Sequence, residues 1–301
     1  MIRIIVAGFI FIFFAQSVSG QSYLKRRSRG FYASTASRNV ILTFGTGTSH
    51  YFGDLARDGD FNNIKANVNI GARYRFYDRL AVSADLSWFR LTGDDATDPG
   101  KAPRNLSFRS DNFEFSAALH INLFPESRFY LRRFANPYAY GGVGVVNFYP
   151  SAELNGERHQ LRPLHTEAIS YSNFAISFPV GGGVKFRINP YFNIALDGSY
   201  HFLLTDYVDD VSSGIYPSPG SFSDPVAKNL SDRSGELGAN PTFAEEGRMV
   251  RGNPDNKDGF MIFNLKLEYY FTEIKPSYYH RRIKSYKKNR KRVKPPRRRR
   301  M

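Results

Sequence analysis

The sequence contains no cysteine and only one tryptophan among its 301 residues. Without cysteine the chain cannot form disulfides, and it cannot carry a lipid on an N-terminal cysteine. After its first twenty residues it also lacks any apolar run of the roughly 18 residues that a membrane-spanning helix requires. Disulfide-stabilised folds, lipid-anchored proteins and helix bundles that cross membranes are therefore excluded.

The first twenty residues have the pattern of a secretory signal peptide. Arg3 gives a positive start, an apolar run follows from Ile4 to Ala15, and Val18 and Gly20 are small residues before a cleavage site. We therefore predict a signal peptide over residues 1–20 and a mature chain that starts at Gln21. An uncleaved anchor is the alternative, and the short apolar run disfavours it.

Eight segments of the remaining chain alternate apolar and polar residues, which is the period of a β-strand. In the last of them Phe263, Leu265 and Leu267 fall on one face, and Asn264, Lys266 and Glu268 fall on the other. The segments are Asn39–Thr48, Ala66–Phe76, Leu80–Trp88, Phe113–Leu123, Pro137–Phe148, Asn173–Ile188, Phe192–Leu204 and Phe260–Phe271.

These segments predict an all-β fold, an eight-stranded antiparallel transmembrane barrel of the outer membrane. Most are about ten residues long or longer, as a tilted membrane strand requires, and their polar faces carry charges of both signs that would fill a small lumen. Connections also alternate in length, as in such barrels. The long ones, expected outside the cell, are Tyr51–Ile64, Thr92–Phe108, Tyr149–Ser172 and Asp206–Asp258; the shorter ones are Tyr77–Arg79, Pro125–Asn136 and Asn189–Tyr191. Both chain ends are then expected in the periplasm.

Positive charge is concentrated at the two ends of the chain. Residues 281–301 hold 13 Lys or Arg and no acid, which accounts for most of the formal net charge of +15. We predict a basic periplasmic segment over 21–37, the barrel over 38–274, and a basic disordered tail over 275–301. Because nucleic acid is absent from the periplasm, the tail's expected partner is an acidic protein, an anionic lipid or cell-wall carboxylates.

Candidate chemical motifs are weak. Two carboxylate pairs lie in loops, at Asp94–Asp95 and Asp209–Asp210, but the oxygen-rich stretch 253–259 lacks the spacing of a calcium loop. The glycine runs 141–144 and 181–183 lack the Lys and Ser/Thr of a phosphate loop and suit bends in a curved sheet. Ser199, His201 and Asp197 could be drawn as a catalytic triad, but alternate residues on one strand rarely converge. We expect no enzyme activity, cofactor, metal or small-molecule substrate.

Six stretches occur in an order that resembles a known family: HYFGDL (50–55), GARYRFYDRLAV (71–82), GDDA (93–96), RNLSFRS (104–110), TDYVDDVS (205–212) and RGNPDNKDGF (251–260). They are similar to the PorG-like outer-membrane barrels of the type IX secretion system. The basic tail is outside that pattern, and Gly259 and Phe260 stand where the family often has an aromatic pair. The motif residues are Gly53, Asp54, Gly93, Asp94, Asp95, Arg104, Asn105, Arg109, Asp206, Tyr207, Asp209 and Asp210.

The resemblance implies a non-enzymatic barrel that ties the periplasmic ring of the secretion machinery to the outer membrane. Its partners would be outer-membrane lipid and the ring components. The expected periplasmic contact residues are Arg128, Arg132, Arg133, Arg281, Arg282, Lys284, Lys287, Lys288, Arg290, Lys291, Arg292 and Lys294. Two alternatives remain open at this point: an OmpA-like structural barrel that tethers the envelope, and a narrow passive pore.

Overall fold

The computed structural model describes residues 40–56, 63–126, 133–189, 191–237, 250–255 and 257–271. The predicted signal peptide, the basic N-terminal segment and the basic tail lie outside the described residues. Eight long strands form the barrel wall: β1 (Val40–Phe52), β2 (Lys65–Arg75), β3 (Leu80–Asp94), β4 (Ser107–Asn122), β5 (Ala135–Asn147), β8 (Phe174–Arg187), β9 (Phe192–Leu203) and β10 (Gly259–Phe271).

The eight strands close into an antiparallel barrel. Each pairs with its neighbours in chain order, and β1 pairs with β10 to complete the ring. Closure leaves no open sheet edge along the wall, as a strand structure in lipid requires. The predicted eight-stranded antiparallel barrel is confirmed. None of the helices in the described part of the chain has the length and apolar character to cross a bilayer.

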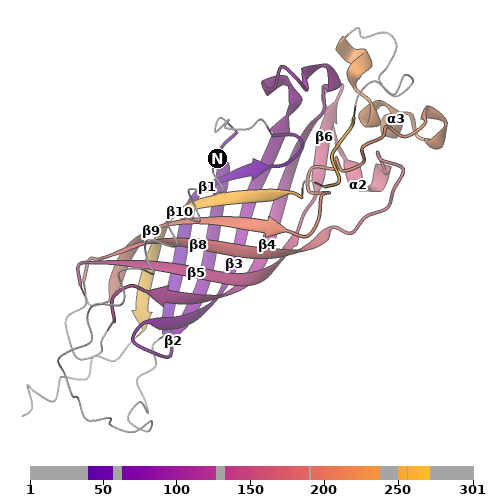
Figure 1. Ribbon diagram of the computed structural model, residues 1–301. Coiled ribbons are helices and arrows are strands. Elements are labelled where there is room, and N and C mark those ends of the chain that lie inside the picture. Colours follow the sequence, from indigo (N-terminus) through magenta and orange to yellow (C-terminus); the bar gives the residue numbers. More distant parts are fainter. Residues whose placement is uncertain are drawn as a thin grey trace, which may run out of the picture. The chain divides into compact units, whose positions relative to one another are not determined.

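The two ends of the barrel differ. At one end, here called the short-turn end, Val40 at the start of β1 pairs with Phe271 at the end of β10. The opposite, long-loop end carries the hairpin of β6 (Pro150–Leu154) and β7 (Glu157–Gln160) together with the short helices α2 (Leu161–Leu164) and α3 (Pro225–Ser231). Figure 1 shows these elements gathered at that one end. The chain therefore enters and leaves the barrel at the short-turn end.

Partway along the strands the inward face changes from polar to apolar and the outward face from apolar to polar. On β3, Val82 and Leu86 face outward and are about half exposed, while Ser83 and Ser87 face the lumen and are buried. Beyond Trp88 the polarity of the two faces is exchanged. Apolar Phe89 and Leu91 face inward and are fully buried, whereas polar Arg90, Thr92 and Asp94 face outward. Lipid surrounds the first part and water the second, so the inversion marks the membrane boundary at the long-loop end.

The lumen within the apolar band is filled by paired charges, here called the lumen network. Arg73 lies 2.5 Å from Glu268, Arg75 lies 2.7 Å from Glu126, and Lys266 lies 2.7 Å from Asp197. Lys185 is 3.4 Å from Glu126 and donates to Asn122 at 2.8 Å. All these side chains are buried. An eight-stranded barrel leaves interior space only for its own side chains, and here they occupy it.

Above the lumen network lies an apolar core that joins the strand ends to the long loops. Phe89 of β3 stacks on Phe260 of β10 at 4.4 Å, and Phe148 stacks on Tyr171 at 6.4 Å. Leu161 of α2 and Leu230 of α3 belong to the same buried cluster. The long loops thus fold into a cap over the barrel mouth.

Several predicted strands were too short. β3 continues six residues beyond Trp88, and β4 begins at Ser107 instead of Phe113, because apolar packing inside the cap supports the extensions. The connection 149–172, predicted as a loop, contains the β6–β7 hairpin. β6 continues β5 in the same register along β4, since Phe113 pairs with Asn147 and Arg109 pairs with Ser151.

The glycine-rich strands allow close approach of neighbouring strands, as predicted for a curved sheet. A side chain at Gly142 would collide with the carbonyl oxygen of Ala117, and one at Gly183 would collide with that of Leu196. The β5–β8 pairing is interrupted opposite Pro179, between the pairs Gly141–Val180 and Gly144–Ser177, because proline has no N–H to donate.

Candidate functional site

A dense cluster of buried charges holds the cap together, and it is called the cap cluster here. It combines two arginines with seven carboxyl groups, all no more than 8% exposed. Its members are Asp54, Asp95, Arg104, Glu167, Asp206, Asp209, Asp210, Arg251 and Asp258. These residues come from the connections after β1, β3 and β9, from the segment before β8, and from the segment before β10, so the cluster binds all the long loops to one another.

Arg104 is the first centre of the cap cluster. It lies in the turn between β3 and β4, and its guanidinium makes a two-pronged contact with Asp95: Nε to Oδ2 at 2.7 Å and an Nη2 contact to Oδ1 at 2.6 Å. The same side chain donates to the carbonyl oxygen of Asp54 at 2.9 Å and to that of Arg251. Such a planar, multiply bonded guanidinium fixes geometry as well as charge. Arg104 therefore joins three separate loops.

Arg251 is the second centre. It pairs with Glu167, donates to the carbonyl oxygen of Asp210 at 2.9 Å, and donates through Nε to that of Ser231 at 3.2 Å. Glu167 also accepts the backbone N–H of Ser212 at 2.9 Å. Asp210 adopts a left-handed backbone, with φ of 66°. This conformation is uncommon for a residue with a Cβ atom and persists where the surroundings hold it.

Two hydroxyl groups donate hydrogen bonds to the carboxylate of Asp210. Thr166 donates to Oδ2, and the Tyr171 hydroxyl donates to Oδ1 at 2.5 Å. Tyr171 in turn stacks on Tyr207, with ring centroids 4.7 Å apart. Burial raises the pKa of Asp210 to about 6, although Arg251 opposes that rise.

Tyr51, Asp209 and Asp258 form a hydrogen-bonded trio in the cap. The Tyr51 hydroxyl lies 2.6 Å from Asp209 Oδ2 and 2.6 Å from Asp258 Oδ1. A hydroxyl donates only one hydrogen, so the second short contact needs a proton on one carboxyl group. Burial raises the pKa of both Asp209 and Asp258 well above the usual range, and the charge of Asp258 adds to the rise at Asp209 while that of Asp206 adds to the rise at Asp258. Both the geometry and the direction of these pKa shifts favour a proton held between the two carboxyl groups.

Asp206 adds a further buried carboxyl group to this region. It is 1% exposed, and neither of its carboxylate oxygens makes a hydrogen bond of normal geometry with a described residue. Burial raises the pKa of Asp206 to about 7, and the charge of Asp54 contributes. The cap cluster thus contains more carboxyl groups than its arginines can neutralise, and protons make up part of the difference.

Most of the motif residues predicted from the sequence lie in this cap. Asp54, Asp95, Arg104, Asp206, Asp209 and Asp210 belong to the cap cluster itself. Asn105 adopts φ of 58° and its amide donates to the carbonyl oxygen of Arg233 at 3.2 Å. Asp94 accepts the N–H of Ala96 at 2.9 Å. Three further positions line it: Gly53 lies against Tyr51 and Asp258, Gly93 lies against Leu55, and Tyr207 stacks on Tyr171. Arg109 lies outside it, on the outer face of β4, 3.5 Å from Asp111.

Sequence reasoning missed the partners of these residues. Glu167 was not singled out, and Arg251, Asp258 and Tyr51 were not proposed as site residues. Glu167 and Arg251 are 84 positions apart, and the two residues bridged by Tyr51 are 158 and 207 positions from it. No local spacing could reveal such pairs in a single sequence. The motif stretches 251–260 and 50–55 do contain Arg251, Asp258 and Tyr51, and they were the available signal.

The predicted contact residues on the short-turn side are only partly visible. Arg133 is exposed, and its guanidinium lies 4.0 Å from the centre of the Phe124 ring. Arg128, Arg132 and the predicted contact residues of the tail lie outside the described residues. No group of three or more His, Asp and Glu side chains in the described ranges is arranged to hold a metal ion.

A serine–histidine–carboxylate relay lies inside the barrel. The hydroxyl of Ser199 is 2.9 Å from Nε2 of His201, and Nδ1 of His201 is 2.9 Å from Glu114. Ser199 and His201 do therefore converge, contrary to expectation, but the carboxylate is Glu114, while Asp197 bonds Tyr138 at 2.5 Å and Lys266. Ser199 and Glu114 are buried, and His201 stacks on Phe260 at 4.5 Å. A nucleophile needs a path for substrate; these residues instead complete the packing of the lumen.

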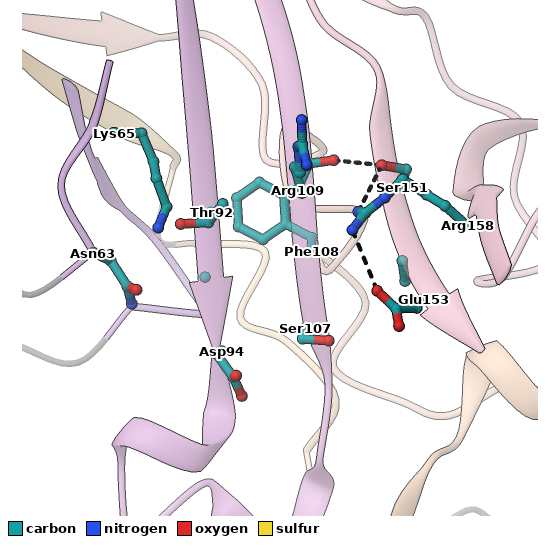
Figure 2. A pocket seen from close by; sticks show the side chains of 12 residues that line it. Asn63, Lys65, Thr92, Asp94, Ser107, Phe108, Arg109, Ser151, Glu153 and Arg158 are labelled. Carbon is teal, nitrogen blue, oxygen red and sulfur yellow. Dashed lines mark hydrogen bonds and ion pairs between the residues drawn. The ribbon is translucent and has the colours of Figure 1, made fainter. Parts of the chain in front are cut away.

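An open groove of about 290 Å³ crosses the wall below the cap. It spans β2, β3, β4 and the β6–β7 hairpin, and Figure 2 shows Lys65 and Arg158 reaching into it from opposite sides. Ser151 donates to the carbonyl oxygen of Arg109 at 2.7 Å, and Arg158 pairs with Glu153 at 3.5 Å.

The sequence matches the family model described as "Outer membrane protein beta-barrel domain" over residues 18–218, which is more than half of the chain. The chain belongs to this family. Its place is accordingly the outer membrane, and the outer-membrane barrel predicted from the alternating segments is shown. No curated protein sequence matches the chain.

The chain is also similar, at low identity, to several solved barrels of the outer membrane. Neisserial surface protein A is 11% identical, with a TM-score of 0.43, and the alignment covers 78% of this chain and 99% of that one. OprG from Pseudomonas aeruginosa is 12% identical, with a TM-score of 0.35 and coverage of 79% and 97%. The outer membrane enzyme PagL is 11% identical, with a TM-score of 0.31 and coverage of 77% and 99%.

Proposed function

We propose that this barrel is a non-enzymatic component of the type IX protein secretion machinery and anchors the periplasmic ring of that machinery to the outer membrane. One observation carries the proposal: five of the six stretches that resemble the PorG-like barrels meet in one buried cluster, while residues 71–82 lie at the short-turn end. Asp54, Asp95, Arg104, Asp209 and Asp210 come from three different loops and lie together. Motif residues that this chain shares with the PorG-like barrels thus build one structural feature, which supports a common role.

The sealed interior supports an anchor over a conduit. The lumen network fills the barrel within the membrane, and the apolar core and cap cluster lie above it. Secreted proteins could not pass through such a barrel, and ions would have to break buried pairs. The passive pore considered from the sequence is therefore the less suitable alternative.

The placement of charge supports docking on the periplasmic side. The pairing of Val40 with Phe271 puts both ends of the strand set at the short-turn end. In outer-membrane barrels that end faces the periplasm. The basic tail follows Phe271 in the sequence, and exposed Arg79 and Arg133 lie at the same end. An acidic surface on the ring would meet many weak positive contacts at once, which together can hold it.

The docking role is tested by co-purification. The full chain, a truncation lacking residues 281–301, and a chain of unchanged length with the tail's Lys and Arg changed to Gln would each replace the natural protein. At low salt, ring components should be recovered with the full chain and lost or strongly reduced with both variants. Raising the salt should reduce recovery with the full chain as well, because the contacts are electrostatic.

Equal recovery of ring components with all three chains would remove the tail from the account. Loss with the truncation alone would indicate that the tail's length or apolar residues matter more than its charge. Capture of peptidoglycan in place of ring components would favour the OmpA-like tether.

A further inference from the structure

The groove on the barrel wall lies at the height of lipid headgroups. Outward-facing residues on β3 and β4 pair in register: Trp88 pairs with Phe113, and the next outward pairs toward the long-loop end are Arg90 with Asp111 and Thr92 with Arg109. Trp88 and Phe113 are therefore the last apolar pair before the wall becomes charged. Aromatic residues mark the interface between hydrocarbon and headgroups. The groove begins four residues beyond that pair, at Thr92 and Arg109, which is about 13 Å along the strands.

A local separation of strands makes the groove. The β2–β3 pairing stops at Asn67 with Phe89, although β3 continues to Asp94 and stays paired with β4 to its end. The Ser49 hydroxyl donates to the carbonyl oxygen of Arg90 at 2.6 Å in the space left by β2. Lys65 of β2 points into this space beside Thr92 (Figure 2).

The positive charges of the groove are only loosely held. Arg109 pairs with Asp111 at 3.5 Å and Arg158 with Glu153 at 3.5 Å, and both arginine side chains are more than a third exposed. Asp111 makes its shorter contact, 2.7 Å, with Arg90 instead. Long, exposed pairs contribute little to stability, so these cations are free to exchange partners.

Two polar groups in the groove lack partners. Lys65 makes no ion pair with any described residue, and the buried Oγ1 of Thr92 has no hydrogen-bond partner among them. A buried hydroxyl without a partner is unfavourable, and an acceptor placed in the groove would remove that cost. The groove thus offers a donor hydroxyl and three cations at one interface.

We infer that the groove binds the phosphate of a lipid headgroup in the leaflet that surrounds the long-loop end. Arg109 and Arg158 bind the phosphate oxygens, Lys65 adds a third charge, and the acyl chains lie on Trp88 and Phe113. Guanidinium groups bind phosphate in a two-pronged geometry, which suits this role. A lipid, and not a soluble phosphate, is the ligand because the site adjoins the apolar band. This inference depends on the membrane position of the barrel and not on the proposed secretion role.

The test measures lipid binding to the purified, folded full-length barrel by native mass spectrometry, with lipid A carrying two phosphates as the probe. Loss of two charge-assisted contacts in the double variant Arg109→Gln/Arg158→Gln should weaken binding about tenfold or more. Lys65→Gln alone should weaken it about threefold, as the loss of a single exposed charge. Lys228→Gln, which changes an exposed lysine of α3, is the control and should bind like the natural protein.

Two additional probes distinguish the source of the phosphate. Lipid A without phosphates should bind at least about tenfold more weakly than the phosphorylated form, because the headgroup contacts are then missing. Inorganic phosphate should displace the lipid only at far higher concentration than lipid A itself. Equal binding by all variants, equal binding of dephosphorylated lipid A, or displacement by inorganic phosphate at the concentration of the lipid would each overturn the inference.

Discussion

The lumen network and the cap cluster are both buried and both charged, but they are balanced differently. In the lumen, Arg73, Arg75, Lys185 and Lys266 each contact a carboxylate, so opposite charges neutralise one another. In the cap, two arginines face seven carboxyl groups, and bound protons provide part of the balance. The cap should therefore respond to pH near neutrality.

The difference follows from the surroundings of the two regions. Lipid encloses the lumen, where an unpaired charge is costly to bury. The cap lies above the aromatic boundary at Trp88, next to water, where its loops can open and exchange protons. A protein in the outer membrane thus combines a rigid wall with a cap whose stability depends on protonation.

The largest expected effect comes from breaking the cap at Arg251. Arg251→Met leaves Glu167 buried without its partner, which should destabilise the closed cap by about 3 kcal/mol. Amides of residues 206–213 should then exchange hydrogen about 100-fold faster in the folded barrel. Hydrogen exchange followed by mass spectrometry provides the measurement.

Arg233→Gln is the matched control for that experiment. Arg233 lies in the same long loop and pairs with the partly exposed Glu236 at 2.9 Å. Because the Glu236 carboxylate is open to water, the pair should contribute less than about 1 kcal/mol, and exchange should change little. If both variants exchanged alike, Arg251 would not be a centre of the cap.

A smaller effect is expected from the lumen. Arg73→Met removes the partner of Glu268, but Lys185 also stabilises that carboxylate, so the loss should be about 2 kcal/mol. Urea unfolding of the barrel in lipid would show a lower midpoint, while exchange in the cap stays as in the natural protein. Faster cap exchange in this variant would mean that the two regions are not independent.

The stability of the closed cap should depend on pH through Asp206. The pKa of Asp206 in the folded cap, about 7, is above the ordinary carboxyl value, so its protonated form favours the closed state. The contribution of Asp206 to the stability of the closed cap is then fully present near pH 4 and is lost as the pH rises to about 7. Cap amides should exchange about 30-fold faster at pH 7.5 than at pH 5.5, after correction for the intrinsic rate, because about 1.5 pH units of this range lie between the ordinary pKa and the folded pKa of about 7.

Asp206→Asn tests the cause of that response. The amide cannot ionise, so the variant should retain a closed cap at pH 7.5 and lose most of the pH dependence. An unchanged pH response in the variant would assign it to Asp209, Asp210 or Asp258 instead.

The smallest effect concerns conduction. In planar bilayers the natural barrel should show almost no single-channel current, because the lumen network fills it. Arg251→Met should open the cap without creating a channel. Stable conductance steps in the natural protein would restore the passive pore as an explanation.

The sequence predicted the wall of this barrel well and its cap poorly. Alternation identified all eight strands because lipid outside and polar packing inside impose period two. The prediction of the third strand ended at Trp88, since the alternation reverses at Phe89 when water replaces lipid outside. Read as a reversal, that change would have predicted both the strand extension and the membrane boundary.

The hairpin of β6 and β7 was missed although a local signal was present. Asn155 and Gly156 have φ of 53° and 83°, the conformation that favours Asn-Gly in tight hairpin turns. The cap cluster had no equivalent signal beyond its motif stretches. Contacts such as Glu167 with Arg251 join distant loops, and only the folded chain shows which carboxylates meet which arginine.

The most direct test of the anchoring role is deletion of the gene, followed by measurement of the secretion of cargo that carries the C-terminal type IX signal. The account predicts that this cargo stays inside the cell and that the natural barrel restores its export. Normal secretion in the deletion strain, with a weakened envelope as its only defect, would contradict the account and leave a structural tether in its place.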